Sequence, residues 1–108
     1  NKMTKIFVNP GICGFDTLIE AKKADDVISL QINSECKNVK KLANTLTRFS
    51  LQDMRNAKSL TENTVYKTAA RYIPHFSCPI PCAIFKAIEA ELGWADKKNI
   101  SMEFVNEP

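Results

Sequence analysis

The sequence predicts an α+β fold, a two-layer sandwich in which helices cover one face of a mostly antiparallel four-stranded sheet. Short strand-like segments separated by turn residues come first, and the apolar residues change to helical spacing after Ser34. A last alternating segment follows the helical part. The expected order is therefore β-β-β-α-α-α-β, with the helices packed on the apolar side of the sheet.

Four segments are predicted to be strands. The third has the clearest alternation, with Ile28, Leu30 and Ile32 on one face and polar residues between them. Turn residues separate the first three strands, because Pro10-Gly11 suits a type II turn and Asp25-Asp26 suits a hairpin. The predicted strands are residues 4–8, 15–23, 27–33 and 100–104.

Three helices are predicted between the third and last strands. The first has Ser34 as its N-cap and apolar residues at helical spacing, namely Val39, Leu42, Ala43, Leu46 and Phe49. A short helical turn is expected at 51–57, and the second helix covers 62–73, ending before Pro74. The third helix begins near Pro79 and runs to Leu92, with Gly93 as its C-terminal cap.

The composition is that of a globular protein, and residues 1–108 are predicted to form a single domain. Hydrophobic residues make up 44% and charged residues 25% of the chain. If Met3 is the natural start, Asn1 and Lys2 are an added remnant. No apolar run reaches the ~18 residues of a membrane helix, and no signal peptide is visible, so a cytoplasmic location without membrane contact is expected.

The net charge of +3 does not indicate a nucleic-acid partner. The lysines of the region are interleaved with acids instead of forming a basic stripe. The residues concerned are Lys22, Lys23, Lys37, Lys40 and Lys41, and Glu20, Asp25, Asp26 and Glu35. A protein partner or a homodimer remains open.

The four cysteines, Cys13, Cys36, Cys78 and Cys82, are predicted to converge on one thiol or metal site. Cys13 precedes the second strand and Cys36 follows the third, at nearly equal distances from the hairpin turn. In an antiparallel pair such residues meet at the open end of the hairpin. Cys78 and Cys82 flank the start of the last helix, where Pro79 suits position N1 and Cys78 the N-cap.

Helix starts favour thiolates, because free N–H groups and the positive end of the helix dipole stabilise negative charge. Cys36, Cys78 and Cys82 all have such positions in the predicted fold. Gly11 and Gly14 flank Cys13 and allow close approach of the backbone. The only histidine, His75, lies three residues before Cys78 and is a candidate alternative ligand or outer partner of the site.

Four short elements resemble a family of small uncharacterised cysteine-motif proteins found in bacteria and archaea, many of them anaerobic. They are residues 9–15 (Asn-Pro-Gly-Ile-Cys-Gly-Phe), 34–36 (Ser-Glu-Cys), 75–82 (His-Phe-Ser-Cys-Pro-Ile-Pro-Cys) and 85–89 (Phe-Lys-Ala-Ile-Glu). The resemblance covers nearly the whole chain and implies no known activity. An anaerobic setting would suit an oxygen-sensitive thiol site.

Three functions follow from this reading, and metal binding is preferred. Four thiolates can bind zinc tetrahedrally or hold an iron–sulfur cluster. Alternatively, helix-start thiols can serve thiol redox or sulfur-transfer chemistry. A third interpretation is a structural or interaction domain with buried thiols, since free cysteine is often buried. Whether the protein is an enzyme is left open, because no hydrolase triad or phosphate-binding loop is visible.

Overall fold

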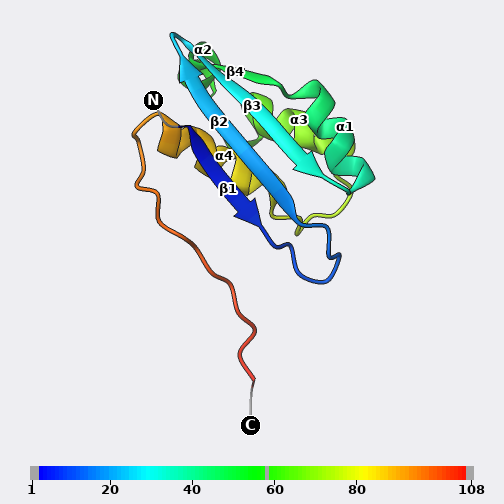
Figure 1. Ribbon diagram of the computed structural model, residues 1–108. Helices are drawn as coiled ribbons and strands as arrows, with labels where there is room; N and C mark the ends of the chain where they lie inside the picture. The colour runs from blue at the N-terminus through cyan, green and yellow to red at the C-terminus, as the bar shows by residue number, and fades with distance from the viewer. Residues whose placement is uncertain (1–2, 58, 107–108) are drawn as a thin grey trace.

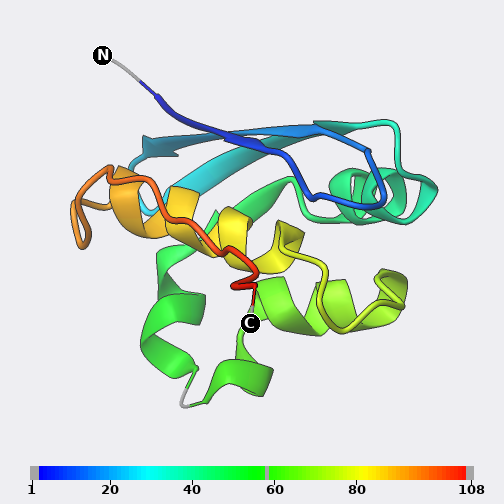
Figure 2. The same ribbon diagram turned by 90° about the horizontal axis from the view of Figure 1, so that it is seen from below.

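A four-stranded antiparallel sheet, in the order β1-β2-β3-β4, forms one layer of the computed structural model, which describes residues 3–57 and 59–106 (Figure 1). In chain order the elements are β1 (Thr4–Val8), β2 (Thr17–Ala24), β3 (Val27–Ser34), α1 (Lys37–Thr45), β4 (Arg48–Ser50), α2 (Leu51–Asn56), the 3₁₀ turn η1 (Leu60–Glu62), α3 (Thr64–Tyr72) and α4 (Ile80–Glu91). All helices lie on one side of the sheet (Figure 2). The predicted α+β class and one-sided helix layer are confirmed.

The β2–β3 hairpin forms the centre of the sheet. Its turn lies at Asp25-Asp26, as predicted, with Ala24 opposite Val27. Asp25 has a φ of 57°, a left-handed conformation that aspartate tolerates better than most residues. Pairing continues without interruption to Thr17 opposite Ser34, so the open end of the hairpin is sharply defined.

The core lies between the sheet and helix α4. Alternate residues of β2 and β3 face the helices, which is why Ile19, Ile28 and Ile32 are buried. From α4, the side chains of Ile84 and Ile88 are fully buried against them. Burial of this apolar surface contributes roughly 25 cal/mol per Å² and holds α4 along the length of the sheet.

The fourth strand is not where the alternation at 100–104 predicted it. It is Arg48–Ser50, which pairs with β3 through Phe49 opposite Ile28. The helix predicted to include Phe49 ends at Thr45, because Leu46 leaves helical geometry with φ −99° and ψ 77°. Phe49 is buried in the structure. A helix and a strand would both direct its side chain toward the core, so the spacing of apolar residues alone could not show which of the two forms here.

Residues 95–106 form neither helix nor strand and leave the domain as an extended arm (Figure 1). The predicted last strand is therefore wrong for the chain as described. Its alternation is real, but a strand also needs a free edge to pair with, and the arm does not reach the one that β1 offers.

The other boundaries shift by a few residues. The strand predicted from 15 begins at Thr17, and the predicted helix 62–73 is replaced by η1 and α3, with Asn63 accepting the N–H of Tyr66 as the α3 cap. The helical turn at 51–57 and the α4 range are confirmed. The interpretation of Asn1 and Lys2 lies outside the described residues. No helix within residues 3–57 and 59–106 has the length and apolar character to span a bilayer.

Candidate thiol site

The hairpin register brings Cys13 and Cys36 to the same end of the sheet. Thr17 pairs with Ser34, so Cys13 lies four residues before one strand end and Cys36 two residues after the other. Both cysteines therefore flank the open end of the hairpin in the chain, and the close approach of their thiols stays a prediction. This end of the sheet lies at the lower right of Figure 1.

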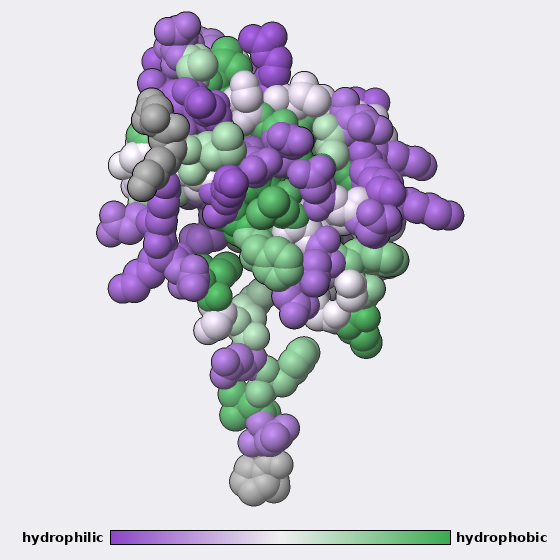
Figure 3. Space-filling model, viewed as in Figure 1, coloured by the Kyte–Doolittle hydropathy of each residue, from purple (hydrophilic) through white to green (hydrophobic). Residues whose placement is uncertain are grey.

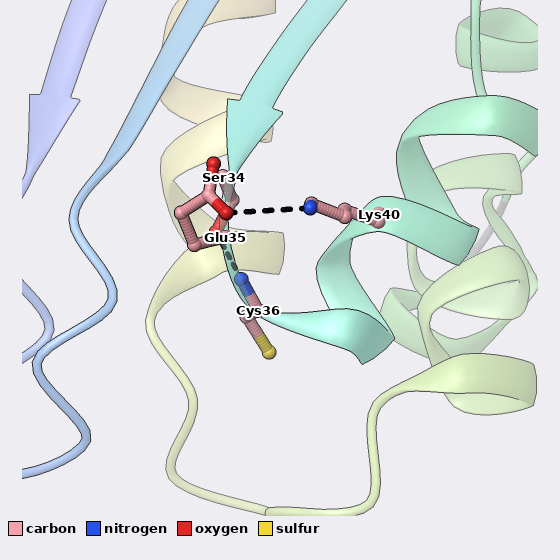
Figure 4. Close-up of polar contacts among 4 residues, drawn as sticks. All are labelled: Ser34, Glu35, Cys36 and Lys40. Carbon is pink, nitrogen blue, oxygen red and sulfur yellow. Dashed lines mark hydrogen bonds and ion pairs between the residues drawn. The ribbon is translucent and has the colours of Figure 1, made fainter.

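Cys36 is the N-cap of α1, a role that the sequence suggested for Ser34. The hydroxyl of Ser34 instead accepts the backbone N–H of Cys36 at 3.1 Å and fixes the chain where it leaves β3. Figure 4 shows the sulfur of Cys36 pointing away from the end of β3, toward the side where the loop between α3 and α4 passes. The Cys36 side chain makes no capping hydrogen bond and is half-buried against the core. Its sulfur is therefore not used by the helix.

Cys13 lies in the loop that joins β1 to β2. The N–H of Gly11 donates to the side chain of Asn9 at 3.1 Å, and the N–H of Gly14 donates to the Gly11 carbonyl at 3.0 Å. Both glycines have positive φ, 90° and 73°, so this turn depends on residues without a Cβ. The turn presents Cys13 exposed to solvent.

Cys78 lies in the loop just before α4. Its N–H donates to the His75 carbonyl at 3.2 Å, closing a tight turn just before α4, and its sulfur packs half-buried against the core. Burial raises the pKa of the Cys78 thiol, negative charge on Cys36 and Cys13 raises it further, and a hydrogen bond from the Ile80 N–H opposes both. The Cys78 thiol is therefore close enough to Cys36 and Cys13 for its pKa to respond to their charge.

The environment of Cys78 differs from the one predicted. Pro79, not Cys78, is the N-cap of α4. The helix start does supply a stabilising N–H from Ile80, but desolvation is the larger effect and the pKa moves up. An isolated Cys78 is thus a protonated thiol at neutral pH, which is the opposite of a helix-activated thiolate.

Cys82 has a separate environment. It is exposed in the first turn of α4. Burial raises the pKa of Tyr66, and negative charge on Cys82 and Glu89 adds to the shift, so Cys82 lies beside Tyr66 on the side of α4 that faces α3. Tyr66 itself stacks on Phe85, with ring centroids 6.0 Å apart. No signal in the sequence links Tyr66 to a cysteine.

A surface groove of about 580 Å³ connects these environments. Cys78 and Cys82 both line it, together with Tyr66, His75 and Phe76. His75 is exposed and borders the groove, while its carbonyl holds the turn of Cys78. The role of His75 as an alternative ligand or outer partner stays a prediction.

The fit to a metal is partial. Across residues 3–57 and 59–106, no set of three or more His, Cys, Asp or Glu side chains is gathered closely enough to coordinate an ion. Cys78 responds to the charge of Cys36 and Cys13, whereas Cys82 affects Tyr66. The four-cysteine ligand set of Cys13, Cys36, Cys78 and Cys82 stays a prediction.

Comparison with known proteins gives one match. The model of a family of unknown function, DUF6951, matches residues 4–104. No curated protein and no solved structure matches the chain. The matched range includes all nine helices and strands of the described chain, all four cysteines and most of the C-terminal arm. The chain therefore belongs to the DUF6951 family.

Proposed function

We propose that the protein binds a thiophilic metal centre, zinc or an iron–sulfur cluster, through Cys13, Cys36 and Cys78. The observation that supports this proposal is the hairpin register, which puts Cys13 and Cys36 beyond the same end of the sheet, together with the effect of both on the pKa of Cys78. A soft donor set of this kind suits zinc or iron–sulfur chemistry better than magnesium or calcium. The fourth coordination position would open toward the groove that Cys78 borders.

The electrostatics of the three thiols support a bound cation. Neighbouring thiolates repel one another, and the Cys78 thiol is also partly desolvated, so its ionised form is disfavoured in the protein alone. A metal ion reverses this balance, because it displaces the proton and neutralises the thiolate charge. The ionised form of the three thiols would then be stable only with the metal bound.

The loop around Cys13 is the segment that would close the site. Cys36 and Cys78 are anchored at the starts of α1 and α4 and pack on the core, whereas Cys13 is exposed in a loop of residues 9–16. Metal binding would require this loop to bring the Cys13 sulfur to coordinating distance from the other two. Zn–S bonds are ~2.3 Å long, so all three sulfurs must come within about 4 Å of one another.

Thiol–disulfide exchange is the second candidate, favoured by the pairing of an exposed thiol with half-buried neighbours. The Cys13 thiolate would attack an external disulfide and release one thiolate, forming a mixed disulfide. Cys36 or Cys78, once deprotonated, would then attack the Cys13 sulfur, releasing the second thiolate and leaving an internal disulfide. The external disulfide is the oxidant and takes both electrons.

The test is metal and thiol analysis of protein purified without oxygen. The metal proposal expects about one zinc ion or one iron–sulfur cluster per chain, lost in Cys36→Ser and Cys78→Ser but kept in Cys82→Ser. The matched cysteine control separates loss of a ligand from loss of any thiol. Metal-free protein that forms a Cys13 disulfide with mild oxidant would support redox exchange instead. Metal-free protein whose thiols stay unchanged under oxidant would leave only an interaction domain.

A further inference from the structure

The C-terminal arm, residues 95–106, has the side-chain pattern of a strand but no strand to pair with. Ile100, Met102 and Phe104 alternate along it and are 61%, 85% and 105% exposed. Figure 3 shows hydrophobic and hydrophilic side chains alternating along the arm, clear of the domain. A one-sided apolar strand in water leaves its backbone groups and its apolar face without partners, which is the usual property of a segment that docks elsewhere.

The direction of the arm is set by the cap of α4. Gly93, with a φ of 78°, donates to the Ala90 carbonyl, and the N–H of Trp94 donates to the Glu89 carbonyl at 2.9 Å. This hydrogen-bonded cap turns the chain out of the helix. The molecule is 51 Å long against 29 and 27 Å in its other dimensions, and the arm accounts for the long axis (Figure 1). The arm thus projects beyond its own domain.

Strand β1 lacks a neighbour on its outer side. It is an edge strand of the sheet, and no other strand in the described parts of the chain pairs with that edge. Its inward-facing residues Ile6 and Val8 are only half-buried, although Ile19 and Ala21 on β2 are buried by the same helix layer. One more strand beside β1 would complete the cover over Ile6 and Val8. An open apolar edge of this kind is a template for strand addition.

We infer that the arm of one chain adds as a fifth strand to β1 of a second copy, and that the exchange is reciprocal. The chain itself supplies both halves of the interface, a free edge at residues 4–8 and an unpaired alternating strand at residues 100–104. The family match begins at residue 4 and ends at residue 104, so both halves belong to the family's common region. Reciprocal exchange gives a closed dimer with two-fold symmetry in which β1 of each copy is covered by the arm of the other.

The side chains of the arm predict which residues matter. Ile100, Met102 and Phe104 share one face of an extended strand, and this face would pack next to Ile6 and Val8 under the partner's sheet. Val105 lies on the opposite face and is 84% exposed in the single chain. Phe104→Asp and Val105→Asp therefore place the same charge at adjacent positions, but only Phe104→Asp is expected to weaken the dimer.

The test is the molar mass of the full chain by light scattering during gel filtration, with reductant present to exclude disulfide-linked dimers. The wild type should have twice the 12.1 kDa mass of one chain at about 100 μM, a concentration at which micromolar dimers are populated. Phe104→Asp should weaken dimerisation at least about tenfold, because it removes a buried ring and would bury a charge. Val105→Asp should remain dimeric within roughly threefold of the wild-type affinity.

Hydrogen exchange separates the remaining arrangements. In the dimer, the amides of residues 100–104 should be protected, and Phe104→Asp should remove this protection. A monomeric wild type would overturn the inference, whether its arm exchanges freely or is protected by pairing with its own β1. A dimer that Phe104→Asp leaves unchanged would overturn it as well, since the arm would then not form the interface.

Discussion

The two ends of α4 lie at opposite ends of the sheet and have contrasting electrostatics. At its C-terminal end, the carboxylate of Glu91 accepts the Thr4 hydroxyl at 2.7 Å and the Lys23 N–H at 2.9 Å. Burial alone would raise the pKa of Glu91, but these two hydrogen bonds outweigh it, so the pKa is lowered. At the N-terminal end, burial and neighbouring thiolates raise the pKa of Cys78.

The difference is that the chain itself stabilises the charged form of Glu91 but not the charged form of Cys78. Glu91 links α4 to β1 and β2 through hydrogen bonds made within the chain, which indicates a structural role for this carboxylate. At the other end, burial and the charge of Cys36 and Cys13 raise the pKa of Cys78, and the Ile80 N–H only partly opposes them. We therefore propose the thiol end as the place where an external group, a metal or an oxidant, would act.

The middle of α4 should couple the two ends, and breaking it should have the largest effect. Ile84 is fully buried between the sheet and the helix layer. Ile84→Ala should lower the free energy of unfolding by about 2–5 kcal/mol through lost burial and a residual cavity. Urea denaturation measures this change. Ile12→Ala, at a fully exposed position, is the matched control and should stay within about 0.5 kcal/mol.

Removing one sulfur should affect only the thiol end. Cys78→Ser should weaken zinc binding by more than the ~10–100-fold that loss of an outer partner commonly causes, because a ligand itself is lost. Competition with a chromogenic chelator measures the affinity, and circular dichroism checks the fold. Cys82→Ser should change the affinity little. Equal losses in both variants would favour the four-thiolate site over the three-thiolate one.

Removing the carboxylate should affect only the other end. Glu91→Gln should destabilise the fold by about 1 kcal/mol, the usual value of a hydrogen bond, while metal binding is unchanged. Because the folded pKa of Glu91 is lowered, its contribution is present above the ordinary pKa near 4.3 and is lost as the pH falls through the folded value.

Stability measured from pH 6 down to about pH 3 should therefore fall more steeply in the wild type than in Glu91→Gln. Parallel curves for the wild type and Glu91→Gln would mean that the carboxylate does not hold this end of α4.

The smallest effect concerns the position of Cys82. Negative charge on Cys82 contributes to the raised pKa of Tyr66, after burial. Cys82→Ser should lower the pKa of Tyr66 without bringing it to the ordinary value, and stability should change by less than about 0.5 kcal/mol. Ultraviolet titration of the two tyrosines measures the shift, with Tyr66→Phe identifying its signal. An unchanged titration would place Cys82 away from Tyr66 and reopen its role beside Cys78.

Much of the site could be anticipated because local rules control it. The turn at Asp25-Asp26 determines which residues of the hairpin meet, so the shared position of Cys13 and Cys36 follows from counting along two strands. The start of α4 near Cys78 follows from Pro79 and Pro81, which favour a helix start. The division between Cys78 and Cys82 could not be anticipated, since it depends on how α3 packs against α4.

By itself, the sequence determined the hairpin register, the start of α4 near Pro79 and the position of Cys13 and Cys36 beyond the same end of the hairpin. These properties depend on backbone geometry and on residues close in sequence. Only the tertiary structure decided that Phe49 joins β3 as a strand, that burial outweighs the helix start at Cys78, and that residues 100–104 remain unpaired. Each of these depends on which distant surface is near enough to supply a strand edge or to exclude water, and that is a property of packing.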